Sequence, residues 1–108
     1  NNIHVVTTPE GFTFAHTGDQ YNEEDLTWLF DVKTKIPALD VLLINCWANR
    51  LSDTIEGFDP KFVITGHENE LGHAIDHRES YWTSFIKLED VKRPSCLMTW
   101  GETYWYKR

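Results

Sequence analysis

Two short apolar segments most strongly limit what this chain can fold into. Residues 40–46 (DVLLINC) and 62–65 (FVIT) are rich in aliphatic and β-branched side chains and lack the polar alternation of a half-exposed strand. Strands buried on both faces have this pattern, and such strands are typical of parallel sheets. We therefore predict a mixed α/β fold in which both segments belong to one sheet.

Hairpins are expected at both ends of the chain. Extended, β-branched or alternating residues predict strands at 3–8 and 12–16, joined by a short turn. A second hairpin is predicted from strands at 95–100 and 103–106, with a type II′ turn around 101–102. Both hairpins would extend the sheet that the two apolar strands begin.

Two helices should cover one face of this sheet. The first begins at Asn22, which precedes acidic residues suited to a helix N-terminus, and it ends before Pro37. Its apolar face would consist of Leu26, Leu29 and Phe30. The second runs over 74–88. Its apolar face would consist of Ile75, Trp82, Phe85 and Ile86.

Length and charge exclude several classes of protein. With 108 residues, the chain (1–108) is expected to be one folding unit. The net charge of -7 and the scattered basic residues argue against a nucleic-acid partner. The longest apolar run, 41–44, is too short to cross a bilayer. Cys46 and Cys96 lie in apolar surroundings, so buried free thiols are expected in preference to a disulfide between them. Neither has a C-x-x-C partner, which argues against a thiolate metal site.

Side chains that can bind metals are concentrated in two loops. The first loop, 16–19, follows the predicted hairpin strand and contains His16 and Asp19. The second, 65–77, follows the strand at 62–65 and contains three histidines and two glutamates. Loops that leave strand ends are where α/β folds place their sites. A carboxylate from one loop and an imidazole from the other could therefore share a zinc-like ion.

These loops carry a resemblance to a known family. The segment FAHTGD, which ends at Asp19, resembles the strand and loop that deliver a bridging aspartate in proteins of the metallo-β-lactamase fold. The segment KFVITGH, which ends at His67, resembles the last metal-ligand strand of that fold, and LDVLLIN resembles the buried strand between them. The likeness spans nearly the whole chain but covers only the C-terminal half of the αββα sandwich.

The resemblance implies a metal-dependent hydrolase. The expected metal is zinc. Asp19 would bridge two divalent ions, and His67 would complete the coordination of the second ion. The intact protein would hydrolyse a small-molecule, ester or phosphoester substrate with a metal-bound hydroxide. Ligands from the family's His-x-His-x-Asp-His motif are absent here, so the N-terminal half of the same protein is the expected partner. This chain alone should bind metal weakly and be inactive.

Other polar residues near these ligands are expected to support them. They would hydrogen-bond the ligands or line the pocket. These residues are His16, Glu68, Glu70, His73 and His77. Structural interpretations stay open. His16 could be a hydrogen-bonding residue at a strand end, and Asp19 could be an ordinary turn aspartate. The expected location is cytoplasmic, and association of copies through the exposed sheet face is a further expectation.

Two alternative functions compete with the hydrolase. The run from Asn69 to His73 (NELGH) differs at one position from the His-Glu-x-x-His helix of zinc peptidases, which suggests a degenerate form of that site. The other alternative is a binding or scaffold module without metal. Geometry separates them, because a shared metal site requires the Asp19 carboxylate and a His67 ring nitrogen within about 6 Å of each other. The peptidase reading instead requires a helix from Asn69 onward.

Overall fold

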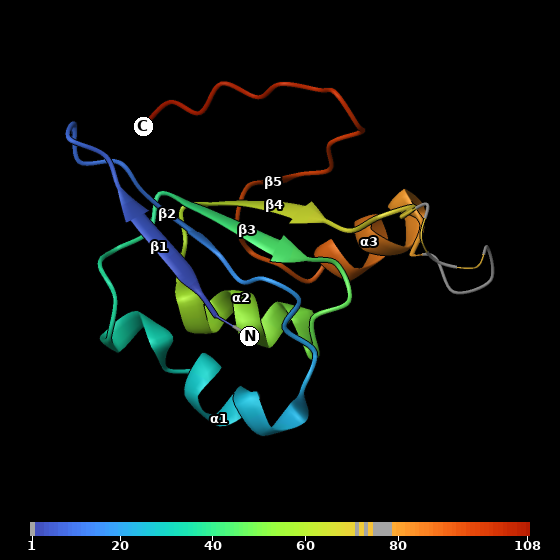
Figure 1. The fold of residues 1–108 in the computed structure, drawn as a ribbon, viewed down its shortest axis with the longest axis horizontal. Helices are drawn as coiled ribbons and strands as arrows, with labels where there is room; N and C mark the ends of the chain where they lie inside the picture. The colour runs from blue at the N-terminus through green and yellow to red at the C-terminus, as the bar shows by residue number, and fades with distance from the viewer. Residues whose placement is uncertain (1, 71, 73, 75–78) are drawn as a thin grey trace.

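The computed structural model describes residues 2–70, 72, 74 and 79–108 (Figure 1). Within this part of the chain, the elements follow one another in the order β1 His4–Thr7, β2 Thr13–His16, η1 Glu23–Asp25, α1 Leu26–Leu29, η2 Val32–Thr34, β3 Val41–Asn45, α2 Leu51–Phe58, β4 Phe62–Gly66, α3 Tyr81–Leu88 and β5 Ser95–Cys96. The mixed α/β class and the N-terminal hairpin are confirmed.

The strands form one five-stranded sheet in the order β1-β2-β3-β4-β5. Only β1 and β2 are antiparallel, and each later strand is parallel to the one before it. Parallel neighbours joined by right-handed crossovers place their connecting helices on the same face of a sheet. Accordingly, α1 and α2 lie together on one side, while the C-terminal segment crosses the other side (Figure 1).

The two apolar strands lie at the centre of the sheet, as predicted, with β3 between β2 and β4. In β3, Leu42 and Ile44 are fully buried in the core under the helices, whereas Val41 and Leu43 are half-buried on the opposite face. The missing alternation therefore reflects two apolar faces, of which only the helical one is thoroughly covered.

The first predicted helix is shorter than expected. One α-helical turn, α1, is flanked by the 3-10 turns η1 and η2 in place of a continuous helix from Asn22 to Pro37. Asp31 departs from helical geometry, and the Thr34 hydroxyl donates a hydrogen bond to the Asp31 carbonyl oxygen. Short polar and β-branched side chains are weak helix formers because they bond to the nearby backbone or lose rotamer freedom. The predicted apolar face is correct in its position, since Leu26 and Leu29 are buried.

Helix α2 is absent from the sequence-based prediction. Leu51, Ile55 and Phe58 recur at helical spacing and are all buried. However, Arg50 occupies the N-cap position in the left-handed region, and no side chain caps the helix. The ordinary start signal, a capping Ser, Thr, Asp or Asn, is therefore missing.

Helix α3 faces the core differently from the prediction. Ser80 caps its N-terminus by accepting a hydrogen bond from the Thr83 N–H. The helix begins later than predicted, because Ala74 and residues 79–80 are not helical, and Ile75 lies outside the described residues. The expected apolar face (Trp82, Phe85 and Ile86) is exposed, and Ser84 and Leu88 are buried instead. Hydrophobic spacing identified the helix correctly but assigned the wrong face to the core.

The predicted C-terminal hairpin is wrong. Strand β5 contains only Ser95–Cys96 and pairs with β4 in parallel, and residues 97–108 form no strand. Gly101 adopts a left-handed φ of 85°, in a turn that the Glu102 N–H closes on the Thr99 carbonyl oxygen. The chain then returns across the sheet, where Tyr104 stacks on Phe62. Aromatic packing on the sheet takes the place of backbone pairing.

A buried carboxylate fastens this returning segment to the sheet. Asp40 accepts hydrogen bonds from Arg108 Nε (3.1 Å) and Nη2 (2.8 Å), from Lys61 Nζ (3.0 Å) and from the Thr13 N–H (2.9 Å). The Arg108 guanidinium, followed by the Thr13 and Lys61 donors, holds the pKa of Asp40 well below its usual range, although burial opposes this shift. Lys61 and Arg108 are themselves largely exposed, so the carboxylate is covered by its own partners.

Replacing Asp40 should make the free energy of unfolding depend less on pH in the acidic range. The pKa of Asp40 is lower in the folded protein than in the unfolded chain, where it lies near 4. Ionised Asp40 therefore stabilises the fold fully above about pH 4, and this stabilisation is lost progressively as the pH falls below that value. We expect Asp40→Asn to lower the free energy of unfolding by about 2 kcal/mol at pH 7, since its cations are partly solvated. Thermal unfolding at pH 7, 4 and 3 should show this difference shrinking. Asp53→Asn, in an exposed ion pair, is the control, and a gap independent of pH would contradict the assignment.

Candidate functional site

The carboxyl ends of β2, β3 and β4 meet at one edge of the sheet, because these strands are parallel neighbours. The loop after β2 is held against β3 by Asn45. Its side-chain amide donates to the carbonyl oxygens of Gly18 (3.3 Å) and Gln20 (3.0 Å). Asn45 is the last residue of β3, so the strand itself fixes the loop that carries Asp19. The two candidate loops therefore converge, as predicted.

Asp19 and His67 lie in direct contact at this edge. Asp19 Oδ1 is 2.7 Å from His67 Nε2, well inside the expected separation. The Asp19 side chain is 60% exposed and that of His67 is 25% exposed. The predicted proximity is confirmed, and the pair can be reached from solvent.

The His67 imidazole is held on several sides. Its other ring nitrogen, Nδ1, is 2.5 Å from Glu70 Oε1, so a carboxylate lies at each nitrogen. The Trp47 ring, from the loop after β3, meets the imidazole edge-on with 5.1 Å between ring centroids. His67 itself has a left-handed φ of 70°, which turns the chain sharply after β4. This arrangement directs Nε2 toward Asp19. Glu70 thus lies on the side of the ring from which a carboxylate orients a metal-binding histidine in many proteins, although its contact with Nδ1 lacks the geometry of a hydrogen bond.

Glu68 points away from this pair. It is buried and accepts a hydrogen bond from the Thr65 hydroxyl rather than contacting His67. Burial, with a smaller contribution from the charge of Glu68, raises the pKa of the Cys46 thiol to about 12. Cys46 is thus a buried free thiol, as predicted, and it is protonated at neutral pH. Cys96 is also free but only partly buried, and burial raises the pKa of its thiol.

His16 has a structural contact. Its Nδ1 accepts a hydrogen bond of 2.9 Å from the Gly18 N–H, which shapes the turn leading to Asp19. This is the strand-end interpretation of His16 given above. His73 and His77, the remaining predicted pocket residues, lie outside the described residues.

The backbone after β4 does not match a zinc-peptidase helix. Asn69 has a left-handed φ of 54° two residues after His67, and residues 67–70 are not helical. A right-handed helix cannot pass through a residue in this conformation. The predicted second ligand of that pattern, His73, is outside the described part of the chain.

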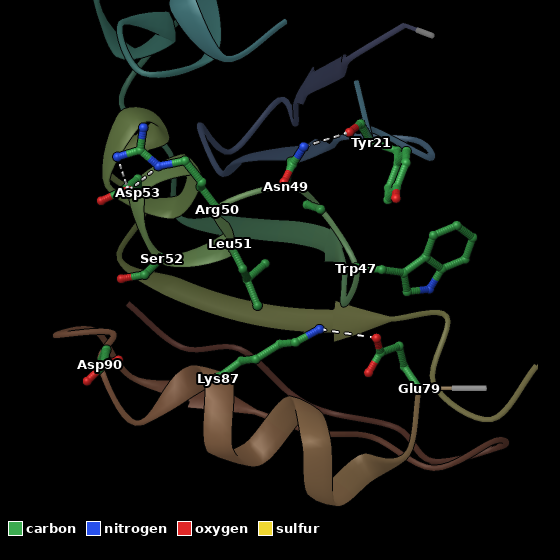
Figure 2. Close-up of a pocket in the computed structure, with 11 residues that line it drawn as sticks. Tyr21, Trp47, Asn49, Arg50, Leu51, Ser52, Asp53, Glu79, Lys87 and Asp90 are labelled. Atoms are coloured by element: carbon green, nitrogen blue, oxygen red, sulfur yellow. Dashed lines mark hydrogen bonds and ion pairs between the residues drawn. The ribbon is translucent and has the colours of Figure 1, made fainter. Parts of the chain in front are cut away.

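A cleft of about 500 Å³ lies beside Trp47 (Figure 2). Trp47 lines it and also contacts His67, so one side chain forms a wall shared by the cleft and the candidate site. Lys87 extends along the cleft and contacts Glu79 (3.3 Å) and the Cys46 carbonyl oxygen (3.2 Å), while Arg50 pairs with Asp53 (2.6 Å). This cleft could not be predicted from the sequence, because one of its walls is the start of α2, which carries no ordinary helix start signal.

The described residues supply only part of a metal ligand set. Asp19 and His67 offer one carboxylate and one imidazole, both of which suit zinc. An ion binding both at about 2 Å fits between them after small side-chain movements. Among the residues that the structure describes, no group of three or more His, Cys, Asp or Glu side chains could hold a metal. Asp19 and His67 could therefore supply two of the ligands of a metal ion, and the remaining ligands would have to come from elsewhere.

In the described ranges, none of the helices has both the length and the apolar character needed to span a membrane.

Comparisons with known proteins identify no family. The chain matches no family model, and no curated protein or solved structure shows significant similarity to it.

Proposed function

We propose that this chain supplies Asp19 and His67 to the divalent-metal site of a hydrolase related to the metallo-β-lactamase fold. The observation that carries the proposal is the 2.7 Å approach of these two side chains. They come from loops after β2 and β4, which flank a central strand, and they meet at the edge where parallel sheets place their sites. The order of the two motifs along the chain and the strand between them support the same reading.

Each side chain has a definable role in such a site. When bound, a divalent ion activates water and polarises a carbonyl or phosphoryl oxygen. Asp19 supplies negative charge to hold cations, and His67 supplies a nitrogen donor that Glu70 orients from the opposite side of the ring. Trp47 and the adjoining cleft would position a small-molecule, ester or phosphoester substrate. Fold analogy alone does not choose among these substrates.

The proposal includes a partner. The remaining ligands would come from an N-terminal half of the same protein carrying the His-x-His-x-Asp-His motif, with a cytoplasmic location. The chain by itself would then bind zinc weakly and lack hydrolytic activity, because two protein ligands leave half of a four-coordinate zinc ion's positions to water.

Zinc titration of the chain tests this proposal. We expect saturable binding, followed by NMR of the histidine side chains, with His67 giving the largest change. Asp19→Ala and His67→Ala should each weaken binding by about tenfold or more, since losing even an orienting group costs 10–100-fold. Glu70→Gln should have a smaller effect, because it keeps an acceptor near Nδ1.

His4→Ala and Asp31→Ala are matched controls, because they remove the same side chains from exposed positions that make no contact with the pair. Both should leave zinc affinity unchanged. Equal affinity in the wild type, Asp19→Ala and His67→Ala would contradict the proposal. It would favour a module without metal, in which Asp19, His67 and Glu70 form a structural ion-pair chain.

A further inference from the structure

A second cavity lies on the sheet face that the helices leave open. Its floor consists of half-buried side chains from three adjacent parallel strands: Phe14, Val41, Leu43 and Ile64. The C-terminal segment passes over this face in Figure 1, and Tyr104 and Tyr106 form the cavity's cover. The cavity is partly open to solvent, and its volume of about 330 Å³ is within the range of small-molecule sites.

Aromatic contacts hold the cover above the floor. Tyr104 stacks on Phe62 with ring centroids 4.8 Å apart, and Tyr106 meets Phe12 edge-on at 6.2 Å. Phe12 immediately precedes β2 and Phe62 is the first residue of β4, so these contacts hold the cover at the amino ends of the two strands. Taking about 30 Å³ for each methylene, similar to a water molecule in the liquid, the cavity holds roughly ten carbon atoms.

One end of the cavity is polar, because Asp40 lines it. Two cations, Lys61 and Arg108, contact the Asp40 carboxylate from just outside the cavity lining. Arg108 uses two of its nitrogens on Asp40. The Lys61 ammonium has three donors and makes one contact with Asp40, and its side chain is 61% exposed. A ligand carboxylate that extends beyond this end of the cavity would replace water at the Lys61 donors that Asp40 leaves to solvent.

We propose that this cavity binds a medium-chain carboxylate, with its apolar chain over Val41, Leu43 and Ile64 and its carboxylate at Lys61. The site is separate from the Asp19–His67 pair. Asp40 precedes β3 at the amino ends of the parallel strands, whereas Asp19 and His67 follow strands at their carboxyl ends. The two proposals can therefore fail independently.

A chain-length series tests the apolar part. NMR titrations of the chain with hexanoate, octanoate, decanoate and dodecanoate should shift the methyl signals of Val41, Leu43 and Ile64. Affinity should rise by about fourfold for each added methylene up to decanoate, the effect of burying one methylene, and then level off as the cavity fills. Shifts centred on the exposed apolar side chains of α3 (Trp82, Phe85 and Ile86) would overturn the proposal, and so would an absence of saturable binding.

Head-group recognition is tested with a neutral partner. Decanoate should bind about tenfold more tightly than decanol to the wild type. Lys61→Met should remove most of that difference, while Lys33→Met, on the helical side in η2, should leave it intact. Arg108 still binds Asp40 in the Lys61→Met variant, so the cover should stay in place. Equal binding of decanoate and decanol to the wild type would overturn the proposal without any variant.

Discussion

Gly57→Ala should strongly destabilise the protein, although it adds only one methyl group. Gly57 lies in α2 where this helix crosses α1, and an added Cβ would lie 2.6 Å from Phe30 Cα and closer still to the Leu29 carbonyl oxygen. Both obstacles are backbone atoms, so no side-chain rotation can relieve the clash. We expect a loss of about 3 kcal/mol or more, at the upper end of overpacking effects. That is a large part of the stability of a domain of this size.

Urea denaturation, followed by circular dichroism, measures this effect. Gly66→Ala is the matched control, since its added Cβ would meet nothing within 4 Å and its φ is not in the left-handed region. It should change the free energy of unfolding by less than about 0.5 kcal/mol. A similar small change in Gly57→Ala would mean that α1 and α2 do not pack as closely as the structure shows.

Phe58→Ala should lower the free energy of unfolding by about 3–5 kcal/mol. Phe58 is the largest fully buried side chain in the described part of the chain, and it lies at the end of α2 within the core cluster under the sheet. Phe85→Ala makes the same substitution on α3, where the ring is 49% exposed. It should cost less than about 1 kcal/mol by the same denaturation measurement. A larger loss for Phe85→Ala than for Phe58→Ala would mean that Phe85, and not Phe58, is the ring buried in the core.

Much of the sheet could be predicted because its strands carry strong local signals. The apolar runs that became β3 and β4, and the β-branched and alternating residues of β1 and β2, depend little on context. Residues 97–108 could not be predicted in the same way. Their aromatic residues satisfy strand propensity, but they pack on Phe62 and Phe12 instead of pairing with another strand. Such tertiary contacts are not encoded in a local pattern.

The helices show where local reasoning is insufficient. The start of α2 has no side-chain cap, and its glycine lowers helix propensity, although that glycine is needed for the close crossing with α1. On α3, spacing placed Trp82 and Phe85 on the core side, but the buried position is taken by Ser84. Periodicity identifies an apolar stripe without specifying which surface the helix packs against.

The candidate site was predicted in part. The proximity of Asp19 and His67 followed from two loops leaving strands of one sheet, and it is confirmed. The contact of Trp47 with His67 could not be anticipated, since it depends on the loop between β3 and the unpredicted α2. Glu68 and Glu70 are two residues apart and looked equivalent in sequence. The turn after β4 buries the first against Thr65 and directs the second to His67.

Zinc-edge anomalous diffraction from crystals of the chain grown with zinc would locate the bound ion. We expect an anomalous peak between the two loops, with an Asp19 carboxylate oxygen and His67 Nε2 both about 2 Å from the ion. Glu70 should remain beside Nδ1 of the same ring. Zinc bound only elsewhere, for example at His4 or His16, with the Asp19–His67 contact of 2.7 Å unchanged, would contradict it.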